Sequence, residues 1–223
     1  LSGSTWSALN EATYAVGPVA ESLRISEILY HPADDPNAEF VELTNVGAET
    51  INLNLVRFTR GIDYTFPSFE LPVGGYCLLV RDIASFEARY GDQLPVLGWY
   101  GGSLDNAGEK LQLLDAVGGG IQSFEYKDNW FDLTDGLGFS LTVQDPQAAA
   151  DLNSKSAWRP SAAAGGSPGA NDAGQVPVLG SVVINELLAD PSGGASDWIE
   201  LYNTTAQAVD LSGWFLSDDA DDL

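Results

Sequence analysis

The chain has 223 residues, 44% of them hydrophobic, and its 32 acidic and 9 basic residues give a formal net charge of −23. A surface of this sign repels nucleic acid and anionic membranes, so the charge excludes both as partners. No apolar run approaches the roughly 18 residues of a membrane-spanning helix, and an aromatic content of 10% argues against a disordered chain.

The first 20 residues are too few to fold alone. They contain a strand-like run, Trp6–Val16. Gly17 and Pro18 are turn residues and mark the end of this run. We interpret residues 1–20 as the last strand of a preceding domain.

Residues 21–171 show the pattern of an all-β domain, in which short apolar runs alternate with turn residues. One helix is expected over 82–90, because Asp82 can cap its first turn and Ile83, Phe86 and Tyr90 share a face. The spacing of the runs predicts a β-sandwich. Its strands are expected near 24–30, 39–45, 51–59, 64–66, 75–81, 110–115, 120–126 and 137–143.

The stretch from Ile25 to Asn45 occurs a second time from Ile184 to Asn203, and the similarity continues at a constant offset to Leu211. Similarity at a fixed offset is the signature of a repeated structural unit. Between the copies, residues 172–180 read as a flexible linker. We therefore expect a complete domain over 21–171 and a truncated second copy over 181–223.

The repeated motifs Phe40-Val-Glu-Leu-Thr-Asn45 and Trp198-Ile-Glu-Leu-Tyr-Asn203 resemble the signature of the lamin-tail domain in its bacterial, secreted form. Trp158, followed by Gly166-Ser-Pro-Gly169, resembles the usual ending of that domain. The resemblance covers about residues 23–171 and the first half of the repeat from 181. It implies an immunoglobulin-like β-sandwich without known catalytic residues, placed inside large extracellular proteins.

Pairing the strands 24–30 and 39–45 as a hairpin places Glu27 opposite Glu42, Ile25 opposite Thr44 and Leu29 opposite Phe40. The same construction places Glu186 opposite Glu200 in the second copy. Facing like charges destabilise a sheet by about 0.2–1 kcal/mol, yet the pair occurs twice.

Three interpretations of the paired glutamates remain open. In the first, the register differs and each carboxylate accepts hydrogen bonds from main-chain amides or hydroxyls. In the second, Glu27 with Glu42 and Glu186 with Glu200 bind Ca²⁺, whose preferred ligands are carboxylate oxygens. In the third, the pair is an acid/base couple of the glycosidase kind. Apart from Ca²⁺, no cofactor is expected.

Nucleophilic catalysis has little support in the sequence. The only cysteine, Cys77, lies in an apolar run and is expected to be buried. The only histidine, His31, precedes a proline in a turn and is expected to be a solvated turn residue. One histidine and one cysteine do not make a zinc site. We therefore predict that the chain is not an enzyme.

Four aromatic residues are expected in or near loops: Trp99, Tyr100, Trp130 and Phe131. They either form a contact surface for carbohydrate or protein or plug the open ends of the sandwich. The predicted function is that of a structural or interaction module of a secreted or cell-surface protein, which mediates adhesion or spaces other domains. The alternative is an accessory binding module of an extracellular enzyme with its catalytic domain upstream. The expected partner is a cell-surface protein or carbohydrate.

Overall fold

The computed structural model describes residues 17–148, 150–172, 180–189 and 196–206, and singly Val209, Leu211, Trp214, Leu216 and Ser217. Contacts between residues divide the chain into two compact units, residues 1–171 and 172–223. The run Trp6–Val16, interpreted above as a strand of a preceding domain, lies outside the described residues.

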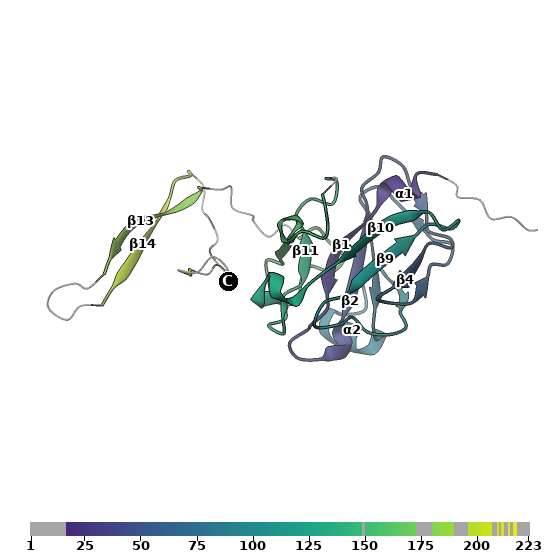
Figure 1. The fold of residues 1–223 in the computed structure, drawn as a ribbon, viewed down its shortest axis with the longest axis horizontal. Coiled ribbons are helices and arrows are strands. Elements are labelled where there is room, and N and C mark those ends of the chain that lie inside the picture. Colours follow the sequence, from purple (N-terminus) through teal and green to yellow (C-terminus); the bar gives the residue numbers. More distant parts are fainter. Residues whose placement is uncertain are drawn as a thin grey trace, which may run out of the picture. The chain divides into compact units, whose positions relative to one another are not determined.

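The first unit is built on a six-stranded sheet, here called the larger sheet, with the strand order β12-β11-β1-β2-β7-β8 (Figure 1). Neighbouring strands are antiparallel except β7 and β8, which run parallel. The bounds are β1 (Leu23–Leu29), β2 (Phe40–Asn45), β7 (Tyr76–Val80), β8 (Val96–Trp99), β11 (Leu141–Val143) and β12 (Trp158–Pro160).

A four-stranded sheet, here called the smaller sheet, faces the larger one in the order β10-β9-β4-β5. Apolar side chains from both sheets meet in one buried core, to which β1 contributes Leu23 and β9 contributes Leu111. The predicted β-sandwich is therefore confirmed. The bounds are β4 (Arg57–Arg60), β5 (Tyr64–Thr65), β9 (Lys110–Leu114), β10 (Gly120–Glu125) and, in a separate two-stranded pair, β3 (Ile51–Asn52) and β6 (Glu70–Leu71).

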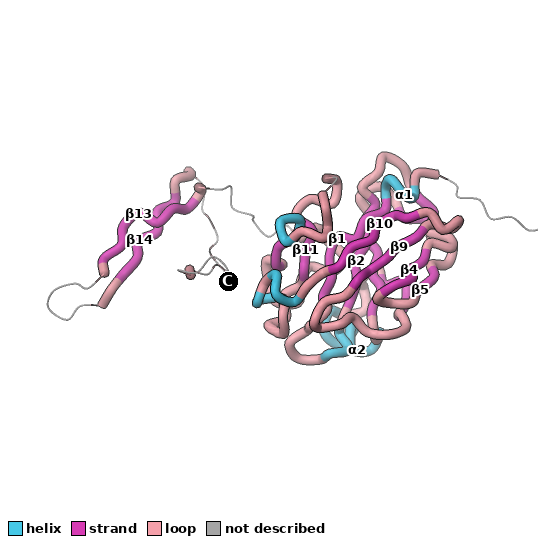
Figure 2. The backbone as a smooth tube through the Cα atoms, in the orientation of Figure 1, coloured by secondary structure: helices cyan, strands magenta, loops and turns pink. Residues whose placement is uncertain are grey.

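The predicted helix is confirmed as α2 (Ile83–Tyr90), drawn in cyan in Figure 2. Asp82 caps it, with its Oδ1 accepting a hydrogen bond from Ser85 N at 2.8 Å. Phe86 packs on the face of the larger sheet that is turned away from the smaller sheet, here called the outer face. There it joins a second apolar cluster formed by Leu29, Phe40, Leu78 and Val80.

The other helical elements are short. They are α1 (Val19–Ser22) and the 3-10 turns η1 (Pro36–Ala38), η2 (Asp128–Trp130), η3 (Asp132–Thr134) and η4 (Lys155–Ala157). None of the helices within the described part of the chain is long and apolar enough to cross a membrane.

Several predicted strands differ from the structure. The strand expected over 51–59 is divided into β3 and β4, because Leu55 has a φ of 63° and interrupts the extended backbone. Only the last three residues of the strand expected over 137–143 are extended, since Gly138 has a φ of 84°. The strands β6, β8 and β12 were not predicted.

In the second unit the structure describes an antiparallel hairpin of β13 (Val182–Leu188) and β14 (Trp198–Asn203). Most of its apolar side chains are exposed, up to 63% at Leu187. No further strand pairs with either β13 or β14 among the described residues.

Candidate functional site

The predicted acidic pair, Glu27 and Glu42, exists in the structure. The two residues are partners in the register between β1 and β2, and so are Leu29 and Phe40. Because side chains alternate along a strand, the glutamates share the outer face with Leu29 and Phe40. Both glutamates are only 1% exposed.

A β-bulge shapes the strand beside the pair. The prediction that Ile25 pairs with Thr44 is wrong, because Ile25 pairs with Leu43 and Ser26 is the extra residue of a bulge between Ile25 and Glu27. The bulge shifts the alternation of β1, so that Ile25 faces the core while Glu27 faces outward.

Hydroxyl and main-chain donors surround both carboxylates. Glu27 accepts hydrogen bonds from Ser140 Oγ, from the main-chain N of Ser167 at 2.9 Å and from Ser167 Oγ at 3.1 Å. Glu42 accepts from Ser26 Oγ and from the main-chain N of Gly169, each at 2.6 Å. The first interpretation assumed a different register, but these hydrogen bonds form while the two glutamates face each other.

The donors Ser167 and Gly169 belong to residues 161–171, here called the closing segment. A Cβ atom added to Gly166 would lie 2.0 Å from Glu27 Oε1, and Gly166 has a φ of 73°. Tyr90 of α2 donates a hydrogen bond to the Gly165 carbonyl at 2.8 Å. The closing segment and α2 therefore cover the outer face together. The closing segment is held there by its hydrogen bonds to Glu27 and Glu42.

The structure leaves Ca²⁺ binding by the glutamate pairs as a prediction. Within the described ranges, no group of three or more His, Cys, Asp or Glu side chains is arranged to hold a metal ion. A cation at Glu27 and Glu42 would compete with the hydrogen-bond donors described above.

The hairpin of the second unit repeats this geometry. Glu186 and Glu200 are register partners, again with a bulge between Ile184 and Glu186. Its bulge residue Asn185 donates a hydrogen bond to Glu200 Oε1, as Ser26 does to Glu42. Glu186 and Glu200 are exposed, unlike their counterparts in the first unit.

Glu39, the residue directly before the repeated motif, was missed as a site residue. Its carboxylate is 2.7 Å from Arg81 Nη1 and accepts hydrogen bonds from Leu104 N at 2.9 Å and Tyr100 Oη at 3.1 Å. Burial raises the pKa of Glu39, against the opposing effect of these partners. The signal in the sequence was the acidic residue at the equivalent position of the second copy, Asp197.

Cys77 and His31 are not brought together. Cys77 is buried in β7, as predicted, and burial raises the pKa of its thiol to about 12. His31 lies at the surface with Nδ1 2.7 Å from Asp135 Oδ1. A thiolate nucleophile is therefore disfavoured at Cys77.

The four predicted aromatic residues have different environments. Trp99 is 67% exposed, whereas Tyr100 and Trp130 are 2% and 7% exposed. The Trp130 ring packs 6.3 Å from the Trp158 ring, and Phe131 is half-buried under Lys155. Tyr100 and Trp130 therefore plug the sandwich and do not contribute to an exposed contact surface.

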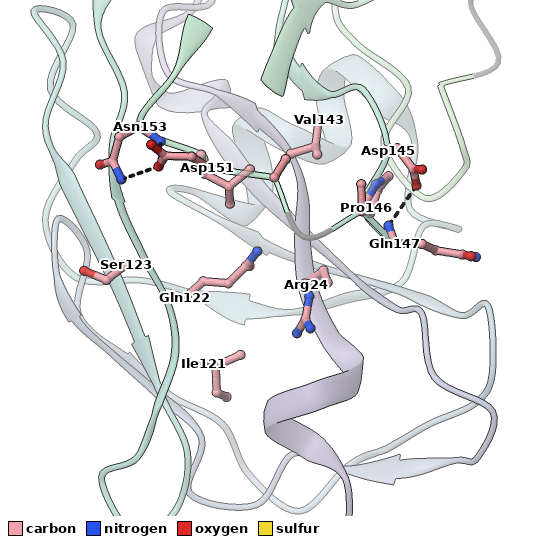
Figure 3. A pocket seen from close by; sticks show the side chains of 13 residues that line it. Arg24, Ile121, Gln122, Ser123, Val143, Asp145, Pro146, Gln147, Asp151 and Asn153 are labelled. Carbon is pink, nitrogen blue, oxygen red and sulfur yellow. Dashed lines mark hydrogen bonds between the residues drawn. The ribbon is translucent and has the colours of Figure 1, made fainter. Parts of the chain in front are cut away.

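A groove of about 300 Å³ lies beside β10, and we call it the edge groove (Figure 3). Its walls are residues 121–123 of β10, the loop residues 145–148 and 150–153, and the side chains of Arg24 and Val143. Gln122 Oε1 accepts a hydrogen bond from Ile25 N at 2.7 Å and so connects the two sheets at this place. Nothing in the sequence distinguished this groove, because strands and a loop far apart in the chain form it.

Comparison with known proteins agrees with this architecture. The family model of the Lamin Tail Domain matches residues 18–128 and 175–222, most of the chain, consistent with one complete and one partial copy. No curated protein matches the chain. The first matched range ends before β11, β12 and the closing segment, which the structure nevertheless places in the first unit.

Proposed function

Because this chain belongs to the lamin tail domain family, whose fold is an immunoglobulin-like β-sandwich, we propose that it is a non-catalytic interaction and spacing module. Its setting is a larger secreted or cell-surface protein, where it mediates adhesion or holds other domains apart. A fold alone does not determine a function, so the proposal depends on how the side chains of the site are used.

The observation that carries the proposal is the use of the buried carboxylates. Glu27, Glu39 and Glu42 have the burial that acid/base chemistry exploits. Each instead accepts hydrogen bonds from donors of the same domain. These hydrogen bonds connect the closing segment to β1 and β2, and they connect the loop at Leu104 to the start of β2. Their positions support a structural role.

An activity assay tests the non-catalytic part of the proposal. The complete chain is incubated with chromogenic esters, glycosides and phosphate esters, and we expect release of the chromophore at the rate of buffer alone. A hydrolytic activity that survives purification and is lost in Glu42→Ala, while the variant remains folded by circular dichroism, overturns the proposal.

One observation favours the alternative function of an accessory module beside an extracellular enzyme. Trp99 is exposed at the end of β8, the outermost strand of the larger sheet. An exposed indole stacks well on a sugar ring or a partner protein. Retention on insoluble polysaccharide that is lost in Trp99→Ala but kept in Val117→Ala, a control at another exposed apolar residue, supports this alternative.

A further inference from the structure

On the side of β10, the larger sheet of the first unit extends further than the smaller sheet. This strand is the last of the smaller sheet and contacts β1, whereas the larger sheet continues beyond β1 with β11 and β12. Among the described residues, no strand of the smaller sheet lies beyond β10. The edge groove occupies this side of β10, with Val143 of β11 in its wall.

The main chain of β10 presents unused hydrogen-bonding groups there. Tyr126 N donates to the Glu109 carbonyl of the neighbouring β9 segment at 3.1 Å. Main-chain groups alternate in direction along an antiparallel strand, so those of Glu125 and Ser123 point away from β9. Asn153 Oδ1 accepts the Glu125 amide at 3.1 Å. The amide and carbonyl of Ser123 have no partner among the described residues.

The loop opposite β10 is held in place and does not itself pair with the strand. The indole N of Trp158 donates to the Leu152 carbonyl at 2.9 Å, and Asp151 Oδ1 accepts from the side chain of Asn153 at 2.8 Å. Figure 3 shows Asp151 and Asn153 on one side of the groove and Asp145 at its far end. The Asn153 side chain thus makes one hydrogen bond of the kind that a further strand would make.

We propose that the edge groove binds an extended peptide that carries lysine or arginine and adds as a strand to the free edge of β10. Main-chain hydrogen bonds to Ser123 supply the pairing, and Ile121, Val143 and Leu152 supply apolar contacts for alternate side chains. This inference rests on the proposed function as an interaction module and gives it a partner class.

The charge of the groove selects a cationic peptide. Asp145 and Asp151 line it, and the whole chain carries −23. Among the residues that line the groove, the one basic side chain is Arg24. It donates hydrogen bonds to the carbonyls of Ala20, Glu21 and Leu23 and is held against α1. An acidic peptide meets repulsion at the loop end of the groove, so electrostatics distinguishes the two.

The test uses the complete chain with fluorescein-labelled acetyl-Lys-Val-Thr-Val-Lys-Val-amide and, as the matched probe, the same peptide with glutamate in place of lysine. We expect the lysine peptide to bind at least about tenfold more tightly by fluorescence anisotropy. Ser123→Pro removes the outward-facing amide without removing a hydrogen bond to β9, and should weaken binding about tenfold. Ser123→Ala keeps the amide and should bind like the wild type.

Amide exchange in the wild-type chain is a second measurement that does not depend on a variant. The lysine peptide should slow exchange of the Ser123 amide, and this decides the matter if Ser123→Pro does not fold. Unchanged exchange, equal binding of both peptides, or full binding by folded Ser123→Pro each overturn the inference. The Ser123 amide could also be protected without peptide, in a way that depends on protein concentration or on the presence of residues 1–16. That result would mean that the chain itself occupies the groove, and it also overturns the inference. None of these results affects the activity assay that tests the proposed function.

Discussion

Glu27 places a buried carboxyl group among hydrogen-bond donors of its own domain. It accepts hydrogen bonds from Ser140 and from two groups of Ser167, and removing one partner of a buried hydrogen bond leaves the other partner unsatisfied. In Glu27→Gln, an NH₂ group replaces the oxygen that accepts from Ser167 Oγ, so this hydrogen bond must reverse or break. We expect a loss of about 1–3 kcal/mol in the free energy of unfolding, measured by urea denaturation.

Glu49→Gln is the control for this prediction, because Glu49 is exposed and the same chemical change occurs in water. Its effect should stay within about 0.5 kcal/mol. If the two variants unfold at the same urea concentration, the hydrogen bonds of Glu27 do not stabilise the domain.

Gly166 is a position where only glycine fits. An added Cβ would lie 2.0 Å from Glu27 Oε1, and the φ of 73° is unfavourable for any residue with a side chain. Gly74 has a similar φ of 67° but nothing within 4 Å of the added Cβ. Gly74→Ala should therefore cost about 1–2 kcal/mol from backbone strain alone, and Gly166→Ala clearly more. Equal melting temperatures would show that the closing segment can move away from Glu27 without cost.

Glu39 makes the stability of the domain depend on pH. Burial raises its pKa in the folded protein above the usual value of 4.5, so the folded state holds this proton more tightly than the unfolded state. This contribution therefore favours the folded state at acidic pH, and it is lost as the pH rises from 4.5 through the raised pKa. Glu39→Gln cannot titrate at this position.

The measurement is the difference in unfolding free energy between wild type and Glu39→Gln across this pH range. As the pH rises, the unfolding free energy of the wild type should fall relative to that of Glu39→Gln. This trend is expected whatever the size of the difference at any one pH. A difference that is constant with pH would show that the ion pair with Arg81 and the two hydrogen bonds cancel the effect of burial.

At the scale of the elements, the sequence predicted the strands that carry the sandwich but not the bulge in β1. Strict alternation from Leu23 would place residue 27 in the core, whereas the core residues are Leu23, Ile25 and Ile28. The change of spacing from two to three residues was visible, and it recurs at Val182, Ile184 and Leu187. It marks a β-bulge, and reading it would have corrected the partner of Ile25.

The missed elements have physical reasons of another kind. β6 has only two residues and depends on its partner β3 for its definition. β8 pairs in parallel with β7 through a connection that contains α2, so no local turn announces it. β12 lies beside an Ala- and Gly-rich stretch of low strand propensity. The edge groove and the attachment of the closing segment arise from tertiary contacts, which no single stretch of sequence encodes.

The two hairpins offer a matched test of what neighbouring strands contribute. β1 and β2 have β11 and β7 on their outer edges, whereas β13 and β14 have no further strand partner among the described residues. An isolated hairpin is only marginally stable in water. Amides of β13 should therefore exchange with solvent at least about a hundredfold faster than those at equivalent positions of β1.

Leu29 and Leu188 are suitable reporters, because they hold equivalent positions beyond the bulge and pair with Phe40 and Trp198 across their hairpins. Hydrogen exchange followed by NMR gives both rates in one sample. Equal protection at the two positions would mean that β13 is covered by another segment or by a second copy, and dilution of the sample would separate these two explanations.

At the scale of the whole molecule, the net charge of −23 governs the response to ions. Repulsion among the acidic side chains destabilises the folded state. Any added salt screens these charges and so weakens the repulsion. The melting temperature should therefore rise with NaCl. A test of the predicted Ca²⁺ sites must compare salts at equal ionic strength, because Ca²⁺ also screens.

At equal ionic strength, we expect CaCl₂ and MgCl₂ to raise the melting temperature of the main transition equally, and EDTA to leave it unchanged. The reason is that Glu27 and Glu42 already accept hydrogen bonds from Ser26, Ser167 and Gly169, which Ca²⁺ would have to displace. An additional rise with Ca²⁺ that disappears in Glu42→Gln would contradict this and assign the ion to the first pair. A Ca²⁺-specific slowing of exchange in β13 that disappears in Glu200→Gln would assign it to the second pair, where the described residues supply fewer donors.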